Sequence, residues 1–198
     1  MTAPAAPPLT LPDAVADLVR DTYDRASAIL EYGSGGSTVL AAERGKPCLT
    51  VENDRAWGKG VAAWLDHAHP GHGVRLHLVY IGPTRKWGRP SKTQAPLWRW
   101  RYKAYPTSVW NRRDLTPPDV ILIDGRFRPA CFLTSLLRLD RPATLLWDDY
   151  EGRPEYRVVE RVLAPARMVE RMAVFRAQPG LVTKADLSAF KSYFHDPE

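Results

Sequence analysis

The chain has 198 residues, enough for one domain with a substantial core and few for two. Hydrophobic residues make up 44% and charged residues 25% of the chain, which excludes a largely disordered protein, and no apolar run has the length of a membrane span. The net charge of +6 indicates an anionic partner. Its sign alone does not distinguish a nucleic acid, a small anion and a membrane surface.

The first residues are rich in Ala and Pro and predict a disordered tail, residues 1–9, ahead of a single domain at residues 10–198. The two cysteines, Cys48 and Cys131, are too few for a disulfide framework. This favours a reducing cytoplasm.

Apolar residues recur at helical or strand spacing along most of the chain, so its elements can be predicted in order. Thr10 and Asp13 have the spacing of a capping box and predict a helix that ends near Asp24. The predicted strands that follow cover residues 28–31, 48–51, 74–81, 119–124, 143–147 and 168–175, and the predicted helices cover residues 38–43, 57–65, 132–137, 156–163 and 185–194. This alternation predicts one three-layer α/β domain with a doubly wound, mostly parallel sheet.

The predicted turn between the first strand and the next helix is rich in glycine, and it reads Glu31-Tyr32-Gly33-Ser34-Gly35-Gly36-Ser37. Glycine has no Cβ, so a ligand can approach the backbone closely, and a helix that begins near Ser37 directs free N–H groups at that ligand. Glu52 ends the second predicted strand, nineteen residues after Gly33. A carboxylate at this distance is suited to accept two hydrogen bonds from a ribose diol.

These residues, together with Asp124-Gly125, resemble the class I S-adenosylmethionine-dependent methyltransferase family, and within it the small-molecule O-methyltransferases. The resemblance implies a Rossmann-like methyltransferase fold and S-adenosylmethionine as the cofactor. In that family the first acidic residue and the glycines face the methionine part of the cofactor, and the second acidic residue holds the ribose. The predicted cofactor-binding residues are Glu31, Gly33, Ser34, Gly35, Gly36, Ser37, Glu52, Asn53 and Asp124. A carboxylate directly before the turn would repel a pyrophosphate, which argues against a dinucleotide.

Three carboxylates follow the fourth and fifth predicted strands, and they belong to Asp124, Asp148 and Asp149. The carboxyl ends of parallel strands line the ligand crevice of such a sheet, so we expect these groups to meet there. The arrangement resembles the metal site of catechol-type and macrocin-type O-methyltransferases, which implies all three as ligands of Mg²⁺. The alternative is neutralisation by Arg126 and Arg128, which follow Asp124 closely. Asp124 and Asp149 are also the candidate catalytic residues, since either could deprotonate the substrate directly or through a metal.

A long connection at residues 83–118 breaks the rhythm of strands and helices. Between Pro83 and Arg113 it carries nine Arg and Lys residues, Lys92 among them, and no Asp or Glu, with tryptophans and tyrosines interleaved. Because it follows the third strand, we expect a lid over the crevice. The predicted substrate contacts are Trp87, Arg99, Trp100 and Arg101. Alternatively, the insertion binds RNA, or its aromatic side chains pack on the domain or on a second subunit.

The predicted function is methyl transfer from S-adenosylmethionine to a small acceptor that is anionic or hydroxylated, in a cytoplasmic enzyme that could be a homodimer. The alternative is a non-catalytic methyltransferase-like protein that binds RNA or another polyanion through residues 83–113.

Overall fold

The structure is a computed structural model that describes residues 5–91, 93 and 95–197. Residues 1–4 of the predicted tail and Lys92 of the basic segment lie outside the described residues.

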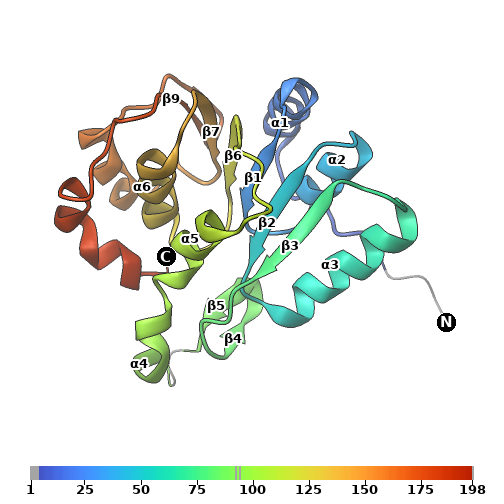
Figure 1. Cartoon of the computed structure of the whole chain (residues 1–198), viewed down its shortest axis with the longest axis horizontal. Coiled ribbons are helices and arrows are strands. Elements are labelled where there is room, and N and C mark those ends of the chain that lie inside the picture. Colours follow the sequence, from blue (N-terminus) through green and yellow to red (C-terminus); the bar gives the residue numbers. More distant parts are fainter. Residues whose placement is uncertain (1–4, 92, 94, 198) are drawn as a thin grey trace.

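A seven-stranded sheet runs through the middle of the molecule (Figure 1), in the order β3-β2-β1-β6-β7-β9-β8. Its strands are β1 (Ile29–Tyr32), β2 (Cys48–Glu52), β3 (Val74–Leu78), β6 (Val120–Ile123), β7 (Ala143–Trp147), β8 (Arg167–Val169) and β9 (Met172–Ala177). The first five of these are parallel, whereas β9 pairs antiparallel with both β7 and β8. The chain order reverses at β1, which lies between β2 and β6, and such a reversal opens a crevice at the carboxyl ends of the strands.

Helices cover both faces of the sheet and bury a core on each. On one face lie α1 (Asp13–Arg25), α2 (Gly36–Glu43) and α3 (Arg55–Ala68), and on the other lie α5 (Ala104–Thr107) and α6 (Arg128–Arg138). Successive strand residues point to opposite faces, so Ile29 joins the first core and Leu30 the second. The structure thus confirms the predicted doubly wound α/β sheet, with strands that are apolar on both sides.

Several predicted boundaries are wrong. Thr10 does not cap α1, which follows Pro12 with no capping side chain. The third strand ends at Leu78 rather than residue 81. The predicted strand at residues 168–175 is two strands, β8 and β9, which turn at Glu170, a residue with φ of +46°. The two helices predicted near the C-terminus are 3₁₀ segments, η4 (Pro154–Arg161) and η5 (Asp186–His195).

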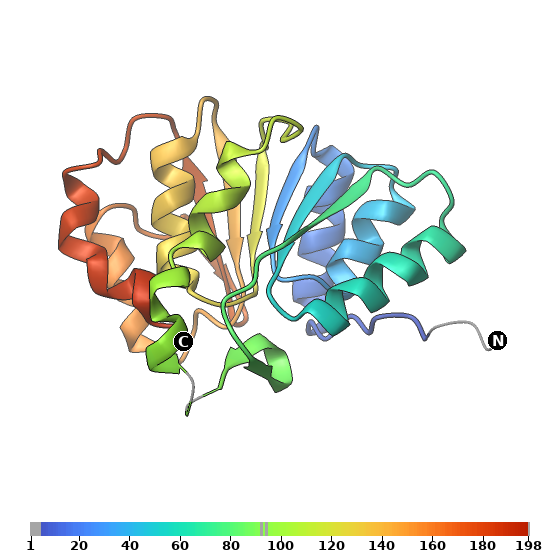
Figure 2. The same cartoon turned by 60° about the horizontal axis from the view of Figure 1, so that its bottom comes forward.

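The insertion divides into a hairpin and a packed helical part. The hairpin contains β4 (Thr84–Arg85), η1 (Lys86–Gly88) and β5 (Arg89–Pro90), and in Figure 2 it projects beyond the sheet, below the other elements. The helical part contains α4 (Ala95–Trp98), η2 (Arg99–Arg101), α5 and η3 (Ser108–Asn111). Tyr102 and Tyr105 of this part are buried in the core beside α6, and the indole of Trp110 donates a hydrogen bond to the Tyr32 hydroxyl. Much of the insertion's aromatic content is therefore core.

Both cysteines are buried free thiols, as expected of small core residues. None of the helices in the described part of the chain combines the length and apolar composition needed to cross a membrane.

Candidate functional site

A cavity of about 660 Å³ opens at the carboxyl ends of the central strands. The glycine turn, residues 33–37, forms one wall, and the hairpin residues 86–89 form another. The remaining lining comes from residues 8–11, residues 52–54, Trp57, Tyr105, residues 124–126, Arg128, Asp148, Asp149, Arg153 and Arg171. Its size is that of a site for a small molecule or cofactor.

The glycine turn packs directly on the loop that follows β6. Gly33 has a φ of +103°, and a Cβ there would lie 2.9 Å from the backbone nitrogen of Gly125. A side chain at Gly33 would therefore separate the turn from Asp124 and Gly125. Gly36 and Ser37 form the first turn of α2, where backbone N–H groups have no partner within the helix. The structure thus gives the cavity a wall of backbone donors.

Glu31 lies beneath this turn and is fully buried. Its carboxylate accepts hydrogen bonds from the Tyr23 hydroxyl at 2.7 Å and from the Thr38 hydroxyl at 2.6 Å. The Thr38 oxygen in turn accepts the N–H of Gly35. Burial raises the pKa of Glu31, and these hydrogen bonds oppose the rise. Glu31 is not among the described residues that line the cavity, so it acts on the turn from behind.

Glu52 does line the cavity, and both of its oxygens are occupied. Oε2 accepts the N–H and the hydroxyl of Ser34, at 3.2 and 2.8 Å, and Oε1 accepts the N–H groups of Asn53 and Asp54, at 2.7 and 2.8 Å. A carboxylate has about four lone-pair positions, so this set fills them. The contact with Ser34 joins the ends of β1 and β2 across the cavity wall.

Asn53 connects the hairpin to the sheet. Its side-chain amide donates to the carbonyl of Gly88 at 2.6 Å. The neighbouring Trp87 has a φ of +65° and is 67% exposed, although it lines the cavity. An exposed aromatic residue in a left-handed conformation is strained, and strain of this kind is concentrated at ligand sites.

The three predicted carboxylates meet as expected, but arginines accompany them. One oxygen from each of Asp124, Asp148 and Asp149 lies within 4.8 Å of the others. Arg128, which is 3% exposed, donates to Asp124 at 3.1 Å and to Asp149 at 3.4 Å. Arg171 binds Asp148 through two nitrogens, at 2.9 and 2.7 Å, and lies 3.4 Å from Asp149. The predicted pairing of Arg128 with these carboxylates is confirmed.

Asp124 has a strongly shifted pKa. Loss of water around the carboxyl group and the nearby charges of Asp148 and Asp149 raise this pKa to about 7, while Arg128 and Arg171 lower it. The largest cause is burial, even though the side chain keeps 34% of its surface exposed. Asp124 therefore exchanges a proton near neutral pH.

The arrangement does not fit a bound Mg²⁺ ion well. Arg171 donates to both oxygens of Asp148 and Arg128 bridges Asp124 and Asp149, so an ion would have to share these carboxylates with guanidinium groups that already neutralise them. Arg153 adds a third guanidinium, 3.6 Å from Asp149. Three positive groups thus already balance three negative ones.

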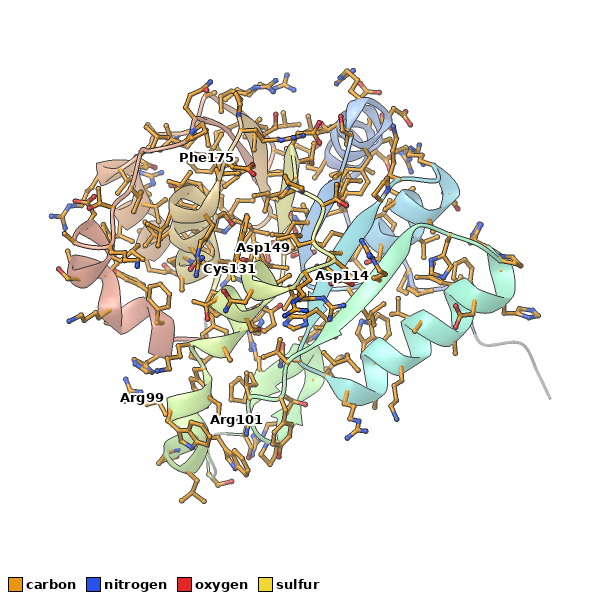
Figure 3. All side chains as sticks on the ribbon, viewed as in Figure 1. Arg99, Arg101, Asp114, Cys131, Asp149 and Phe175 are labelled. Carbon is orange, nitrogen blue, oxygen red and sulfur yellow. The ribbon has the colours of Figure 1, made fainter. Side chains whose placement is uncertain are left out.

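The structure brings together most of the predicted site residues. All predicted cofactor-binding residues except Glu31 line the cavity, as do the three aspartates and Trp87. The predicted substrate contacts Arg99, Trp100 and Arg101 do not line it, and Figure 3 places Arg99 and Arg101 well away from Asp149. Arg101 instead lies over the rings of Tyr80 and Trp100 and donates a hydrogen bond to the carbonyl of Tyr80.

Sequence reasoning missed Trp57, Arg153, Arg171 and residues 8–11. Trp57 is held by a hydrogen bond from its indole to the carbonyl of Ser34, at 2.8 Å. Its position in the first turn of α3, three residues after the N-cap Asp54, could have indicated this. Arg171 lies within a stretch whose apolar pattern predicts one continuous strand, so the sequence does not indicate that Arg171 is in a turn.

No protein-family model and no curated protein matches the chain. Among solved structures, a methyltransferase-like protein from Silicibacter pomeroyi is 41% identical, covers 97% of this chain and 99% of that chain, and superposes with a TM-score of 0.86. The O-methyltransferase TomG from Streptomyces achromogenes, solved with S-adenosylmethionine, is 18% identical over 87% of this chain and 82% of that chain, with a TM-score of 0.55. An O-methyltransferase from Bacillus cereus, solved with S-adenosylhomocysteine, is 15% identical over 84% of this chain and 80% of that chain, with a TM-score of 0.52. The last two share the fold, and the first is a relative over nearly all of both chains.

Proposed function

The chain belongs to the class I methyltransferase family, and from this premise we propose that it transfers a methyl group from S-adenosylmethionine to a small acceptor. The observation that supports this most strongly is the cavity itself. One wall is a glycine turn that leads into the first N–H groups of α2, and Glu52 stands at the end of the next strand.

The cofactor-binding roles follow from what each residue offers. The N–H groups of Gly36 and Ser37, in the first turn of α2, are donors suited to the carboxylate of the amino-acid part. Glu52 accepts a ribose hydroxyl, which takes over the lone pair that the Ser34 hydroxyl now uses. When bound, S-adenosylmethionine supplies a methyl group already activated by its sulfonium.

Basic residues are part of the cavity lining. They include Lys86, Arg89 and Arg126, which favours an acceptor that is anionic or hydroxylated. Asp124 is the residue best suited to take the acceptor proton, because its pKa of about 7 is matched to neutral pH. Asp149 lies beside it and is the alternative base. Neither role needs a metal, and the arginines already provide the counter-charge.

Binding of RNA without catalysis is not favoured, because the relative over nearly the full chain is methyltransferase-like. A cytoplasmic location and a homodimer stay predictions.

The proposed cofactor site is tested by calorimetric titration with S-adenosylhomocysteine. We expect Glu52→Ala to weaken binding at least tenfold, since hydrogen bonds to a charged group contribute roughly 1.5–3 kcal/mol. Ser34→Ala is the matched control, because it removes the hydroxyl that contacts Glu52 but leaves the carboxylate in place.

Ser34→Ala is expected to bind as tightly as the native chain or more tightly. Equal losses in the two variants would mean that Glu52 only supports the turn. Absence of any binding to the native chain, or tight binding of NAD, would refute the proposed function.

A further inference from the structure

The segment from Pro7 to Leu11, here called the N-terminal strap, runs along the cavity instead of away from the domain. Pro8, Leu9, Thr10 and Leu11 all line the cavity, and Pro7 is buried. Leu9 and Leu11 are partly buried against the core beneath α1 and α2. The sequence predicted a disordered tail over most of this segment, yet its described part has a defined place beside the site.

The strap backbone touches the first residue of α2. A Cβ on Gly36 would lie 2.5 Å from the backbone nitrogen of Leu9 and 2.7 Å from the carbonyl carbon of Pro8, both too close for a real contact. The glycine at position 36 therefore lets the strap pass directly over the N-terminal end of the helix.

At its other end the strap is fastened to the carboxylate cluster. Arg171 donates from Nη2 to the carbonyl of Thr10 at 3.2 Å, and the same guanidinium holds Asp148 at 2.7 Å. The strap thus reaches from the turn after β1 to the end of β7, across the carboxyl end of β6. This is the half of the cavity opposite Glu52, which ends β2.

We propose that the N-terminal strap is a wall of the cofactor site and covers the amino-acid half of the bound cofactor, a role that rests on the proposed function. Its two leucines are apolar and line the cavity. Transfer of a methyl group from a cationic donor to an oxyanion neutralises charge, so exclusion of water by an apolar wall favours the reaction. Arg171 links this wall to the acceptor side through Asp148.

Hydrogen exchange measured with and without S-adenosylhomocysteine tests the strap directly. The amides of Leu9, Thr10 and Leu11 report on it, because the flanking prolines have none. We expect the ligand to slow exchange at these amides at least fivefold, together with the amides of residues 33–37. Slowing confined to residues 33–37 would overturn the strap proposal and leave the proposed function intact. If neither segment responds, both are refuted.

Two matched pairs of variants extend the test. Leu9→Ala and Leu76→Ala both shorten a partly buried leucine of the same core, but only Leu9 lines the cavity. We expect Leu9→Ala to weaken S-adenosylhomocysteine binding at least fivefold and Leu76→Ala to leave it unchanged. In the ligand-free protein, Gly36→Ala should speed exchange at residues 9–11, whereas Gly60→Ala, which meets no neighbour within 4 Å, should not. Equal behaviour within both pairs would refute the proposal.

Discussion

Glu31 and Glu52 flank the same glycine turn, but the fold gives them different surroundings. Glu31 is sealed beneath the turn and receives the Tyr23 and Thr38 hydroxyls. Through Thr38 it also orients the N–H of Gly35. Glu52 instead lies at the cavity wall, where exchange of the Ser34 hydroxyl for a ligand hydroxyl is possible. A buried carboxylate with several donors shapes a backbone turn, whereas one at a cavity wall can bind.

Asp124 should make stability depend on pH. Its pKa is raised to about 7 by burial and by the neighbouring aspartates, so the folded chain holds this proton more tightly than the unfolded chain. The stabilising contribution is complete below about pH 4, the ordinary pKa of Asp, and is lost as the pH rises through about 7. We expect the native chain to lose roughly 1–2 kcal/mol more than Asp124→Asn between pH 5 and pH 8, a value reduced because water screens the partly exposed carboxyl group.

Urea unfolding at the two pH values measures this difference. Asp119→Asn is a suitable control. Burial raises the pKa of Asp119, but hydrogen bonds from Ala28 and Ser27 outweigh it and leave this pKa below its ordinary value, outside the range of pH 5 to 8. Parallel pH profiles for the native chain and Asp124→Asn would show that Asp124 is already ionised at pH 5.

At this scale, the sequence identified the residues that follow strands. Gly33, Glu52, Asp124 and Asp148 could be predicted because a parallel sheet gathers the carboxyl ends of its strands at one edge. The burial of Glu31 beneath the turn could not be predicted, since it depends on a hydrogen bond from Tyr23 of the preceding helix. Arg171 could not either, because its position depends on a turn that contains neither Gly nor Pro.

The hairpin from β4 to β5 depends on a few local contacts. Its two strands pair over only two residues each, and Asn53 fastens it to the end of β2 through the carbonyl of Gly88. Loss of this buried hydrogen bond should cost about 1 kcal/mol and release Trp87 from the cavity wall. We therefore expect Asn53→Ala to speed hydrogen exchange at residues 84–89 and to weaken S-adenosylhomocysteine binding severalfold.

Asn111→Ala, which changes an exposed asparagine outside the cavity, serves as the control. Unchanged exchange at residues 84–89 in Asn53→Ala would show that the hairpin is held by other contacts.

The predicted elements are accurate where a long apolar pattern marks them. They are less accurate where contacts with other parts of the fold determine the local structure. Runs of apolar residues predict strands such as β6 and helices such as α6 directly from the sequence. The short helical segments between residues 95 and 111 do not, because each is only three or four residues long. They are positioned by Tyr102 and Tyr105, which pack on Phe127 before α6.

Across the whole molecule, the sheet edge carries opposite charges in balance. Arg128, Arg153 and Arg171 accompany the three aspartates, so we expect 5 mM Mg²⁺ or EDTA to move the melting temperature of the native chain by less than about 1 °C.

Arg171→Gln removes the partner of the buried Asp148 and should destabilise the fold by roughly 2–3 kcal/mol. This is less than the loss of a fully buried pair, because Arg171 is partly exposed.

Thermal unfolding of the native chain and of Arg171→Gln, each with Mg²⁺ and with EDTA, checks this balance of charges. Stabilisation of the native chain by several degrees in Mg²⁺, reversed by EDTA, would contradict it and restore the predicted metal site at Asp124, Asp148 and Asp149.

The central claim is that the cavity beside the glycine turn holds S-adenosylmethionine, and a crystal structure of the chain with S-adenosylhomocysteine tests it most directly. We predict a ribose hydroxyl on Glu52, with the Ser34 hydroxyl displaced, and the amino-acid part against residues 33–37. A ligand bound elsewhere, or a cavity without ligand at saturating concentration, would contradict the claim.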